Sequence, residues 1–180
     1  MAEPFATGSK SAAIETLSRR VWLVGGCSLA VLAGLWWMQD DSADAATFEI
    51  VKSEEEWRRI LQGPAYKVLR QHGTERPYSS PLNLEKRAGT FHCAGCDLPL
   101  FSSETKYESG TGWPSFYRPL ANAVGTKTDR SLLLARTEVH CRRCGGHLGH
   151  VFQDGPPPTG LRYCMNGVAM RFAPAKPGPA

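Results

Sequence analysis

The residues best suited to chemistry in this sequence are its six cysteines, which their spacing divides into groups. Four of them form two CxxC pairs, Cys93 with Cys96 and Cys141 with Cys144. Each pair follows a strand-like segment and lies in a glycine-containing turn. Four thiolates on two such turns are the tetrahedral sulfur set that Zn²⁺ takes in structural sites. Because sulfur would fill every metal position, we expect one zinc ion per chain that stabilises the fold and does no chemistry.

Two other interpretations of the CxxC pairs stay open. An oxidising compartment would favour a pair of disulfides. A thioredoxin-like redox CxxC would require a βαβ setting, which the residues around neither pair provide. The repetition of the same turn-borne pair favours zinc over both.

The two cysteines outside these pairs are Cys27 and Cys164. Cys27 lies in an apolar N-terminal segment, which leaves Cys164 as the free thiol of the folded domain. A lone cysteine is often an inert, small, buried side chain. Here, however, Arg162 and Asn166 lie two residues to either side. On a β-strand, that spacing places both residues on the same face as Cys164.

Further polar residues precede Cys164 in a glycine-rich stretch: His147, His150 and Asp154. A thiol beside a guanidinium and imidazoles can be held as a thiolate, and a neighbouring histidine can pass a proton to a leaving oxygen. We therefore predict that Cys164 is a catalytic nucleophile with this polar ring around it.

The N-terminal segment has the features of an export signal. Residues 21–38 form an uncharged apolar run, which as a helix would be about 27 Å long and just span a bilayer core. Basic residues precede the run and acidic residues follow it, which predicts a cytoplasmic N-terminus and an extracytoplasmic, periplasmic domain. The run begins after Arg19-Arg20, which resembles a twin-arginine signal, and residues 43–45 offer an A-x-A cleavage site.

Residues 1–45 are therefore interpreted as an export signal or a membrane anchor, with cleavage after Ala45 and retention both open. A buried core helix would explain the flanking charges less well. A lipoprotein box at Cys27 is disfavoured because only four apolar residues precede Cys27 and a long apolar stretch follows it. In a retained chain, residues 21–38 would be the only contact with the membrane. We assign residues 46–172 to one catalytic domain and the Pro/Gly-rich residues 173–180 to a disordered tail.

Composition limits the class of protein further. The chain has 180 residues, a formal net charge of +4, 42% hydrophobic and 21% charged residues, which is ordinary for a globular protein and excludes a fibrous or disordered one. A polytopic membrane protein is excluded because there is no second long apolar run. No basic run exceeds Arg142-Arg143, so we expect no nucleic-acid partner.

Local patterns predict two short helices followed by a β-rich region. Ser53 and Glu56 fit a capping box, Trp57, Ile60 and Leu61 share one helical face, and Gly63-Pro64 ends that helix. Pro64 then begins a second helix, with Tyr66, Leu69 and Arg70 at helical spacing, which ends at Gly73. Short apolar stretches separated by turn residues predict strands at Thr90–Cys93, Leu98–Phe101, Ser131–Ala135, Thr137–His140, His150–Gln153, Arg162–Met165 and Val168–Phe172. This pattern predicts a mainly β, antiparallel fold.

Several longer motifs follow one another in order: Gly73–Pro77, Ser109–Phe116, Thr137–Cys141, His147–Phe152, Asp154–Pro156, Pro158–Gly160 and Arg162–Asn166. Together they resemble the B-type methionine sulfoxide reductases, which reduce the R epimer of methionine sulfoxide. The resemblance covers roughly residues 55–172. It implies a fold of two twisted antiparallel β-sheets with short N-terminal helices. Zinc-containing members of that family use two CxxC pairs as a structural site.

The resemblance also implies a mechanism and a role for each site residue. The Cys164 thiolate would attack the sulfoxide sulfur, and methionine would leave a sulfenic acid on Cys164. The other residues matching the family pattern are His147 and His150 for binding and protonating the oxygen, Asp154 and Arg162 for orientation and charge, Asn166 beside the nucleophile, and Trp113 for holding the S-methyl group. Without the resemblance, Trp113 would be interpreted as a core aromatic.

The chain departs from the family pattern at Thr111, where many members carry a resolving cysteine. An external thiol reductant, thioredoxin-like or other, is therefore expected to regenerate Cys164, in preference to a surviving Cys27. The substrate is expected to be methionine-R-sulfoxide, free or in oxidised proteins, and the enzyme a monomer. Two rival classes fit the sequence less well: a zinc-ribbon binding module leaves Cys164 and its polar ring unexplained, and the intact site residues argue against a scaffold that has lost catalysis.

Overall fold

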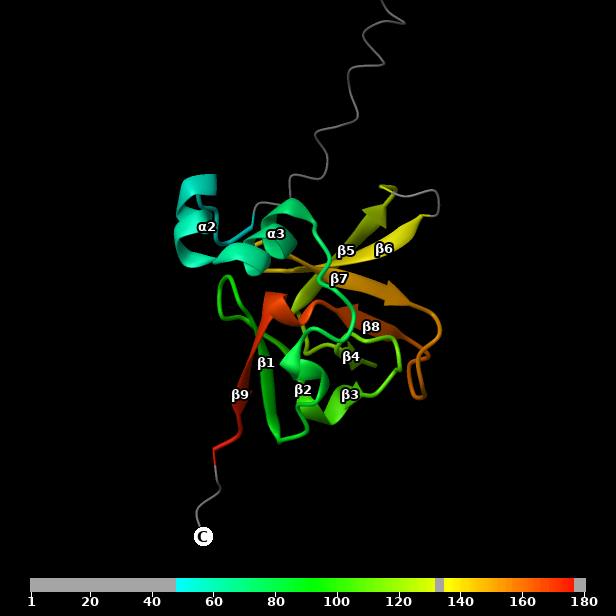
Figure 1. The fold of residues 1–180 in the computed structure, drawn as a ribbon. Helices are drawn as coiled ribbons and strands as arrows, with labels where there is room; N and C mark the ends of the chain where they lie inside the picture. Colours follow the sequence, from blue (N-terminus) through cyan, green and yellow to red (C-terminus); the bar gives the residue numbers. More distant parts are fainter. Residues whose placement is uncertain (1–47, 132–134, 177–180) are drawn as a thin grey trace, which may run out of the picture. The chain divides into compact units, whose positions relative to one another are not determined.

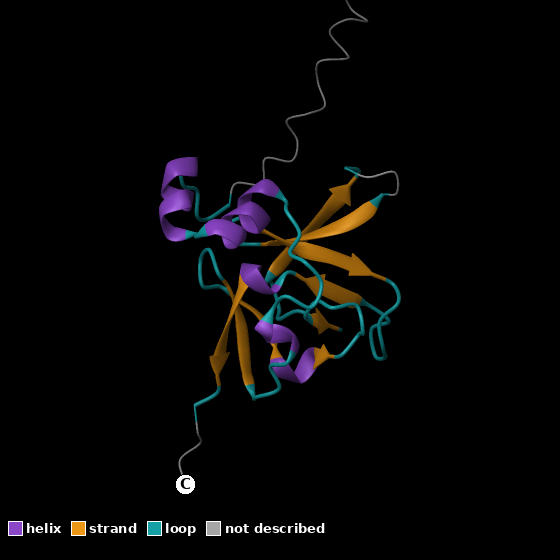
Figure 2. Ribbon diagram, in the orientation of Figure 1, coloured by secondary structure: helices purple, strands orange, loops and turns teal. Residues whose placement is uncertain are grey.

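The computed structural model describes residues 48–131 and 135–176 of the chain. The predicted leader, residues 1–45, lies outside the described residues. Within the described part, no helix combines the length and apolar character needed to cross a bilayer. Figure 1 shows two short helices at one end of a β-rich body, and Figure 2 shows that strands and loops make up most of that body.

The first helix, α2 (Glu54–Ile60), begins with the predicted capping box, in which the Ser53 side chain accepts from the backbone of Glu56 and Glu56 from that of Ser53. Three acidic residues in its first turn favour the positive end of the helix dipole. Trp57 is buried in this helix and Leu61 is buried at its C-cap, as predicted. The prediction for Ile60 was wrong, since this side chain is 52% exposed. The helix is only two turns long, and the narrow face that it buries does not include Ile60.

The second helix, α3 (Gly63–Gln71), begins with Pro64 in its first turn and buries Tyr66, Val68 and Leu69. His72 follows as the C-cap in the left-handed conformation, with a φ of 53°. The backbone N–H of Gly73 donates to the carbonyl of Lys67 and closes the last turn. The chain then enters the loop that carries the first predicted motif.

The strands form two antiparallel sheets, as expected for the fold class. In the described residues, one sheet has the order β2-β1-β9, built from β1 (Gly89–Cys93), β2 (Pro99–Ser102) and β9 (Met170–Pro174). The other sheet has the order β3-β4-β8-β7-β6-β5, built from β3 (Lys106–Tyr107), β4 (Ser115–Phe116), β5 (Val124–Asp129), β6 (Arg136–Cys141), β7 (His147–Phe152) and β8 (Arg162–Met165). Short 3₁₀ helices at Pro81–Asn83, Ser103–Thr105 and Gly167–Ala169 link these elements.

The structure corrects the sequence prediction in three places. Strand β5 was missed because its residues, VGTKTD, are mostly polar and half-exposed at the sheet edge. The strand predicted at 131–135 falls partly outside the described residues, and Ser131 lies in a bend rather than a strand. The disordered tail was assigned too early, because Ala173 and Pro174 belong to β9 and pair with Thr90 and Gly89. Pro174 is tolerated there because it is the last residue of an edge strand.

The core between the sheets is built on aromatic rings. Phe116 stacks on Phe101 with ring centroids 4.3 Å apart and meets the edge of Phe91 at 4.9 Å. All three rings are fully buried, and burial of each contributes about 1.5–3 kcal/mol. Since Phe91 and Phe101 come from one sheet and Phe116 from the other, this cluster fixes how β4 and the adjacent β8 sit against β1 and β2.

Candidate active site and metal centre

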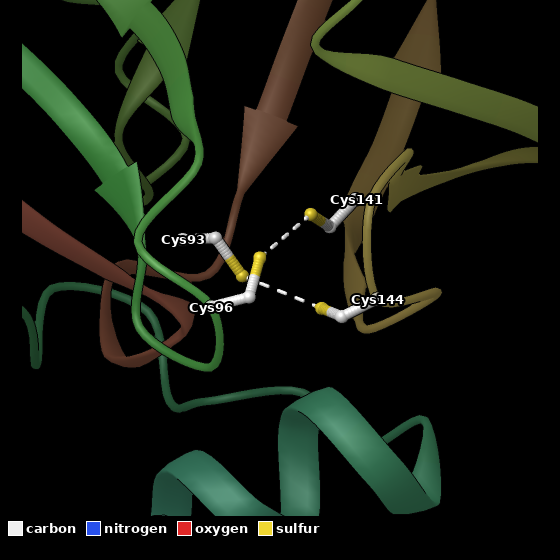
Figure 3. A group of neighbouring side chains, drawn as sticks. All are labelled: Cys93, Cys96, Cys141 and Cys144. Carbon is white, nitrogen blue, oxygen red and sulfur yellow. Dashed lines mark hydrogen bonds between the residues drawn. The ribbon is translucent and has the colours of Figure 1, made fainter. Parts of the chain in front are cut away.

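The two predicted CxxC pairs come together at the ends of two different sheets. Cys93 ends β1 and Cys141 ends β6, and Figure 3 shows the four sulfurs pointing toward one another. The Sγ atoms of Cys93 and Cys144 lie 3.8 Å apart, and those of Cys96 and Cys141 lie 3.5 Å apart. All four sulfurs lie within 4.8 Å of one another.

This geometry fits a metal ion and does not fit disulfides. A disulfide needs sulfurs about 2.05 Å apart, and every cysteine of the described residues is a free thiol. A tetrahedral ion with metal–sulfur bonds of about 2.3 Å needs sulfurs about 3.8 Å apart. The cluster is therefore a structural metal site that joins the two sheets, and four sulfur ligands leave a tetrahedral ion no open coordination position.

Cys164 lies in the middle of the larger sheet. On β8 it is directly opposite Ser115 of β4 on one side and His150 of β7 on the other. The sheet register therefore brings a histidine beside the predicted nucleophile from 14 residues upstream. Gly149 allows β7 and β8 to pair closely, because a Cβ at position 149 would collide with the carbonyl oxygen of Cys164.

Cys164 opens into a small pocket of about 120 Å³. The lining residues are Thr74, Trp113, Arg136, Gly149, His150, Phe152, Cys164 and Asn166. Four predicted site residues thus meet in one cavity: the thiol, an imidazole, an amide and an indole. The other three are not among the lining residues: Arg162 acts directly on Cys164, Asp154 holds Arg162, and His147 packs against His150.

Burial raises the pKa of the Cys164 thiol in the substrate-free site, while a hydrogen bond from Thr111 and the nearby Arg162 guanidinium oppose the rise. Arg162 is held by two parallel hydrogen bonds to Asp154, at 2.9 and 2.8 Å. Its guanidinium also lies over the ring of Phe152, 4.4 Å from the centroid. Asp154 and Arg162 therefore form one unit, with Asp154 orienting the cation that favours the thiolate.

His150 is held by a carboxylate that the sequence did not predict. Its Nε2 lies 2.8 Å from Oδ2 of Asp129, which also accepts from the Arg136 guanidinium at 2.7 Å. Burial lowers the pKa of His150, although Asp129 works against it. Arg136 is itself part of the pocket lining, so an ion pair beside His150 bounds the cavity.

His147 lies behind His150, with ring centroids 5.4 Å apart. Its Nδ1 is 2.8 Å from Oε1 of Glu138, another buried carboxylate that sequence reasoning missed. Its Nε2 is buried and has no hydrogen-bond partner among the described residues.

Trp113 and Asn166 are positioned by one residue, Glu75. The carbonyl of Glu75 accepts from the Trp113 indole at 3.2 Å, and its backbone N–H donates to the Asn166 side-chain oxygen at 2.9 Å. Its carboxylate accepts from the backbone N–H groups of Gly167 and Val168. Asn166 is fixed further by a hydrogen bond from its amide to the carbonyl of Leu148.

Thr111 stands beside the nucleophile. Its hydroxyl lies 3.9 Å from the Cys164 sulfur and 2.8 Å from the hydroxyl of Ser109, which in turn lies 2.8 Å from that of Ser115. The loop reaches this position through two glycines with positive φ; at Gly112, where φ is 91°, a Cβ would also press on Pro77.

The site residues that the sequence analysis did not identify differ in how strongly the sequence pointed to them. Glu75 and Glu138 lie inside two of the motifs that carried the family resemblance, Gly73–Pro77 and Thr137–Cys141, but nothing in their spacing assigned them a contact. Asp129 lies in no motif, and only the pairing of β5 with β6 reveals its place beside His150.

Comparison with known proteins agrees with this geometry. Residues 61–174 match the family model described as the SelR domain. A "Peptide methionine sulfoxide reductase MsrB" of Pseudomonas putida (strain W619) is 57% identical over 127 residues, covering 70% of this chain and 96% of the relative. Proteins with the same name from Methanosarcina barkeri and Agrobacterium fabrum are 54% and 49% identical, covering 72% and 73% of this chain and 92% and 98% of each relative. The chain therefore belongs to the SelR-domain family of MsrB-type peptide methionine sulfoxide reductases.

Proposed function

We propose that this protein reduces the R epimer of methionine sulfoxide to methionine, with Cys164 as the nucleophile. One observation carries this proposal: the Cys164 thiol shares a small pocket with the Trp113 indole, the His150 imidazole and the Asn166 amide. A methyl sulfoxide presents a methyl group, a polar oxygen and an electrophilic sulfur. An aromatic face suits the methyl-sulfur group, and polar donors suit the oxygen.

This step needs no reactant other than the Cys164 thiol and the sulfoxide. The Cys164 thiolate attacks the sulfoxide sulfur, a proton is delivered to the sulfoxide oxygen, and that oxygen passes to Sγ as methionine leaves. The products are methionine and a sulfenic acid on Cys164. The proton lost when the thiol ionises offsets the proton gained by the oxygen.

Each polar residue has a role in this scheme that its contacts support. His150, in the pocket, and His147, behind it, bind and protonate the oxygen. Arg162, oriented by Asp154, stabilises the thiolate. Asn166 fixes the backbone next to Cys164, and Trp113 holds the methyl group of the substrate.

The metal in the four-cysteine site is zinc in our proposal, one ion per chain. Its donors would be Cys93, Cys96, Cys141 and Cys144. Four sulfur ligands leave no position for substrate or water, so its contribution is to folding and not to the reaction. The four sulfurs that bind the metal would also not be free for thiol–disulfide exchange.

Regeneration of the thiol is expected to need an external dithiol, such as a thioredoxin-like protein. One reductant thiol attacks the sulfenic acid, releasing water and forming a mixed disulfide, and a second thiol of the reductant releases Cys164. Thr111 cannot supply the internal sulfur. Oxidised proteins and free methionine sulfoxide are both candidate substrates, and the enzyme acts as a monomer in this proposal.

The N-terminal segment, residues 1–45, would export this reductase or anchor it in the membrane, placing the catalytic domain in the periplasm. The proposal rests on the apolar run with its flanking charges and on the twin-arginine and A-x-A signals. It is consistent with the family model beginning only at residue 61.

The assignment of Cys164 is tested by replacing it. Cys164→Ser should abolish reduction of methionine-R-sulfoxide with dithiothreitol as reductant, while zinc content and the thermal unfolding curve stay as in the wild type. A protein that merely binds partners through its metal module would keep its function in this variant. Retained reductase activity in Cys164→Ser would show that another group is the nucleophile.

A further inference from the structure

Glu138 is a charged side chain that the scheme above leaves without a role. It lies on β6, only 3% exposed, directly opposite His150 of β7 in the strand pairing. Three nitrogen atoms approach its carboxylate: Nδ1 of His147 at 2.8 Å, Nδ1 of His72 at 3.2 Å and Nζ of Lys127 at 3.2 Å. Burying a carboxylate costs several kcal/mol unless it is paired, so a site that collects three partners keeps this one as an anion.

The contacts show which ionisation state prevails. Burial alone would raise the pKa of Glu138, but the His147 hydrogen bond together with Lys127 and His72 outweighs it and lowers the pKa to about 2. Lys127 is Glu138's direct cross-strand partner in the pairing of β5 with β6. The strand register thus places the Lys127 ammonium beside the Glu138 carboxylate on its solvent side, and His147 contacts the carboxylate on its other side.

Glu138 determines what His147 can do. A carboxylate accepts and cannot donate, so the hydrogen bond at 2.8 Å places a proton on Nδ1 of His147. The only remaining nitrogen is Nε2, which is buried and has no partner among the described residues. An imidazole held this way presents Nε2 to an incoming polar atom, and an adjacent anion stabilises it when Nε2 also carries a proton.

His72 connects this arrangement to solvent. It caps α3, its side chain is 54% exposed, and its ring lies 5.2 Å from that of His147. The groups that face His147 and Glu138 are therefore His72, Lys127 and His150, with Asp129 and Arg136 beyond His150. A divalent cation bound by His72, Glu138 and His147 is the competing interpretation, and the ammonium of Lys127 on the same carboxylate disfavours it.

We propose that Glu138 is a positioning residue for sulfoxide reduction, which holds His147 with Nδ1 protonated and Nε2 directed to the sulfoxide oxygen, and that Lys127 moderates its charge from the solvent side. This inference rests on the proposed function. His147 gives its Nε2 proton to the oxygen as the bond from that oxygen to Cys164 Sγ forms and the bond to the substrate sulfur breaks. His147 then remains neutral, with its Nδ1–H still donating to Glu138, until Nε2 is protonated again.

The test compares Glu138→Gln with Glu85→Gln, a matched control in which a carboxylate paired with Arg87, outside the pocket lining, becomes an amide. In Glu138→Gln, kcat should fall about tenfold or more while KM changes less than about twofold, because proton transfer and not binding is impaired. Glu85→Gln should match the wild type.

Lys127→Met gives a second readout in a variant that keeps the carboxylate. Because Glu138 still accepts from Nδ1 of His147, Lys127→Met should keep the wild-type tautomer of His147. In protein labelled with ¹⁵N-histidine, the wild type should show His147 as a single tautomer with Nδ1 protonated, and Glu138→Gln should show a mixture. These signals do not depend on turnover, so Glu138→Gln remains informative if it is inactive, and Lys127→Met remains informative if Glu138→Gln does not fold.

Three outcomes would overturn the inference. The first is a wild-type kcat in Glu138→Gln. The second is a mixture of His147 tautomers in the wild type. The third is a second equivalent of zinc that disappears in His72→Gln, since the carboxylate would then be a metal ligand. Failure of the wild type to reduce methionine-R-sulfoxide would instead reject the proposed function, and the tautomer measurement would still decide the role of Glu138.

Discussion

The hydroxyl of Thr111 lies 3.9 Å from the sulfur of Cys164, at the end of a chain of hydroxyl groups that runs through Ser109 to Ser115. A threonine thus occupies the place from which a second cysteine could attack an oxidised Cys164. The other thiols of the described residues are gathered in the four-cysteine cluster. The site can form a sulfenic acid but cannot resolve it with its own sulfur.

A single turnover without reductant should therefore stop at the sulfenic acid. One equivalent of methionine should be released per chain, and dimedone should label Cys164 and no other residue, because the other thiols within residues 48–131 and 135–176 all belong to the four-cysteine cluster. Mass spectrometry of the protein after one turnover measures this directly. A loss of two hydrogens without a dimedone adduct, accompanied by zinc release, would show instead that a metal-site cysteine resolves the intermediate.

Replacing Thr111 with cysteine should create an internal route. The Thr111 side chain already contacts Cys164, and a disulfide needs only a modest approach of the two sulfurs from that separation. After one turnover, Thr111→Cys should lose two hydrogens and no longer react with dimedone. Thr111→Ser, which keeps a hydroxyl, is the control and should accumulate sulfenic acid as the wild type does.

The metal should be a condition for folding. Cys96→Ser should lose zinc and the cooperative thermal transition, because the free energy of metal binding is part of the free energy of folding and the metal joins β1 to β6. Metal analysis and circular dichroism give the two readouts. Cys164→Ser removes a thiol outside the cluster and should retain about one zinc per chain, while two disulfides and no zinc in the wild type would refute the assignment.

Removing the guanidinium of Arg162 should shift the pH range in which the enzyme is active toward alkaline pH. Burial raises the pKa of Cys164 and Arg162 opposes that rise, so Arg162→Gln should raise the pKa further. The nucleophile must be deprotonated, and the ascending limb of the kcat/KM–pH profile should therefore move to higher pH, with a loss of about tenfold at neutral pH that alkaline pH recovers.

Arg58→Gln provides the matched control for this charge change. Arg58 is an exposed arginine that pairs with Glu54 on α2, away from the pocket. Its profile should coincide with that of the wild type. An Arg162→Gln profile with an unmoved ascending limb would mean that the guanidinium does not act on the thiol.

The parts of this site that could be predicted from sequence are those encoded by local spacing. The CxxC turns and the Ser53 capping box depend on residues a few positions apart, and both are found as expected. The face shared by Arg162, Cys164 and Asn166 follows from strand alternation alone. Trp113 is different, since only the family resemblance distinguished it from a core aromatic.

The parts that could not be predicted depend on pairing between distant segments. Asp129 reaches His150 because β5 and β7 flank β6 in the sheet, and β5 is too polar to be recognised as a strand. Glu138 resembles an ordinary outward-facing strand residue until β6 and β7 are placed side by side. Glu75 acts largely through its backbone, which carries no side-chain signature.

Stereochemistry tests the central claim most directly. In the proposed arrangement Trp113 contacts the methyl group, a histidine the oxygen and Cys164 the sulfur, so the pocket should accept only one arrangement of the three substituents. The purified protein should be assayed with the separate R and S epimers of methionine sulfoxide, with dithiothreitol as reductant. We predict reduction of the R epimer and essentially none of the S epimer. Equal rates on both epimers, or a preference for S, would contradict the account.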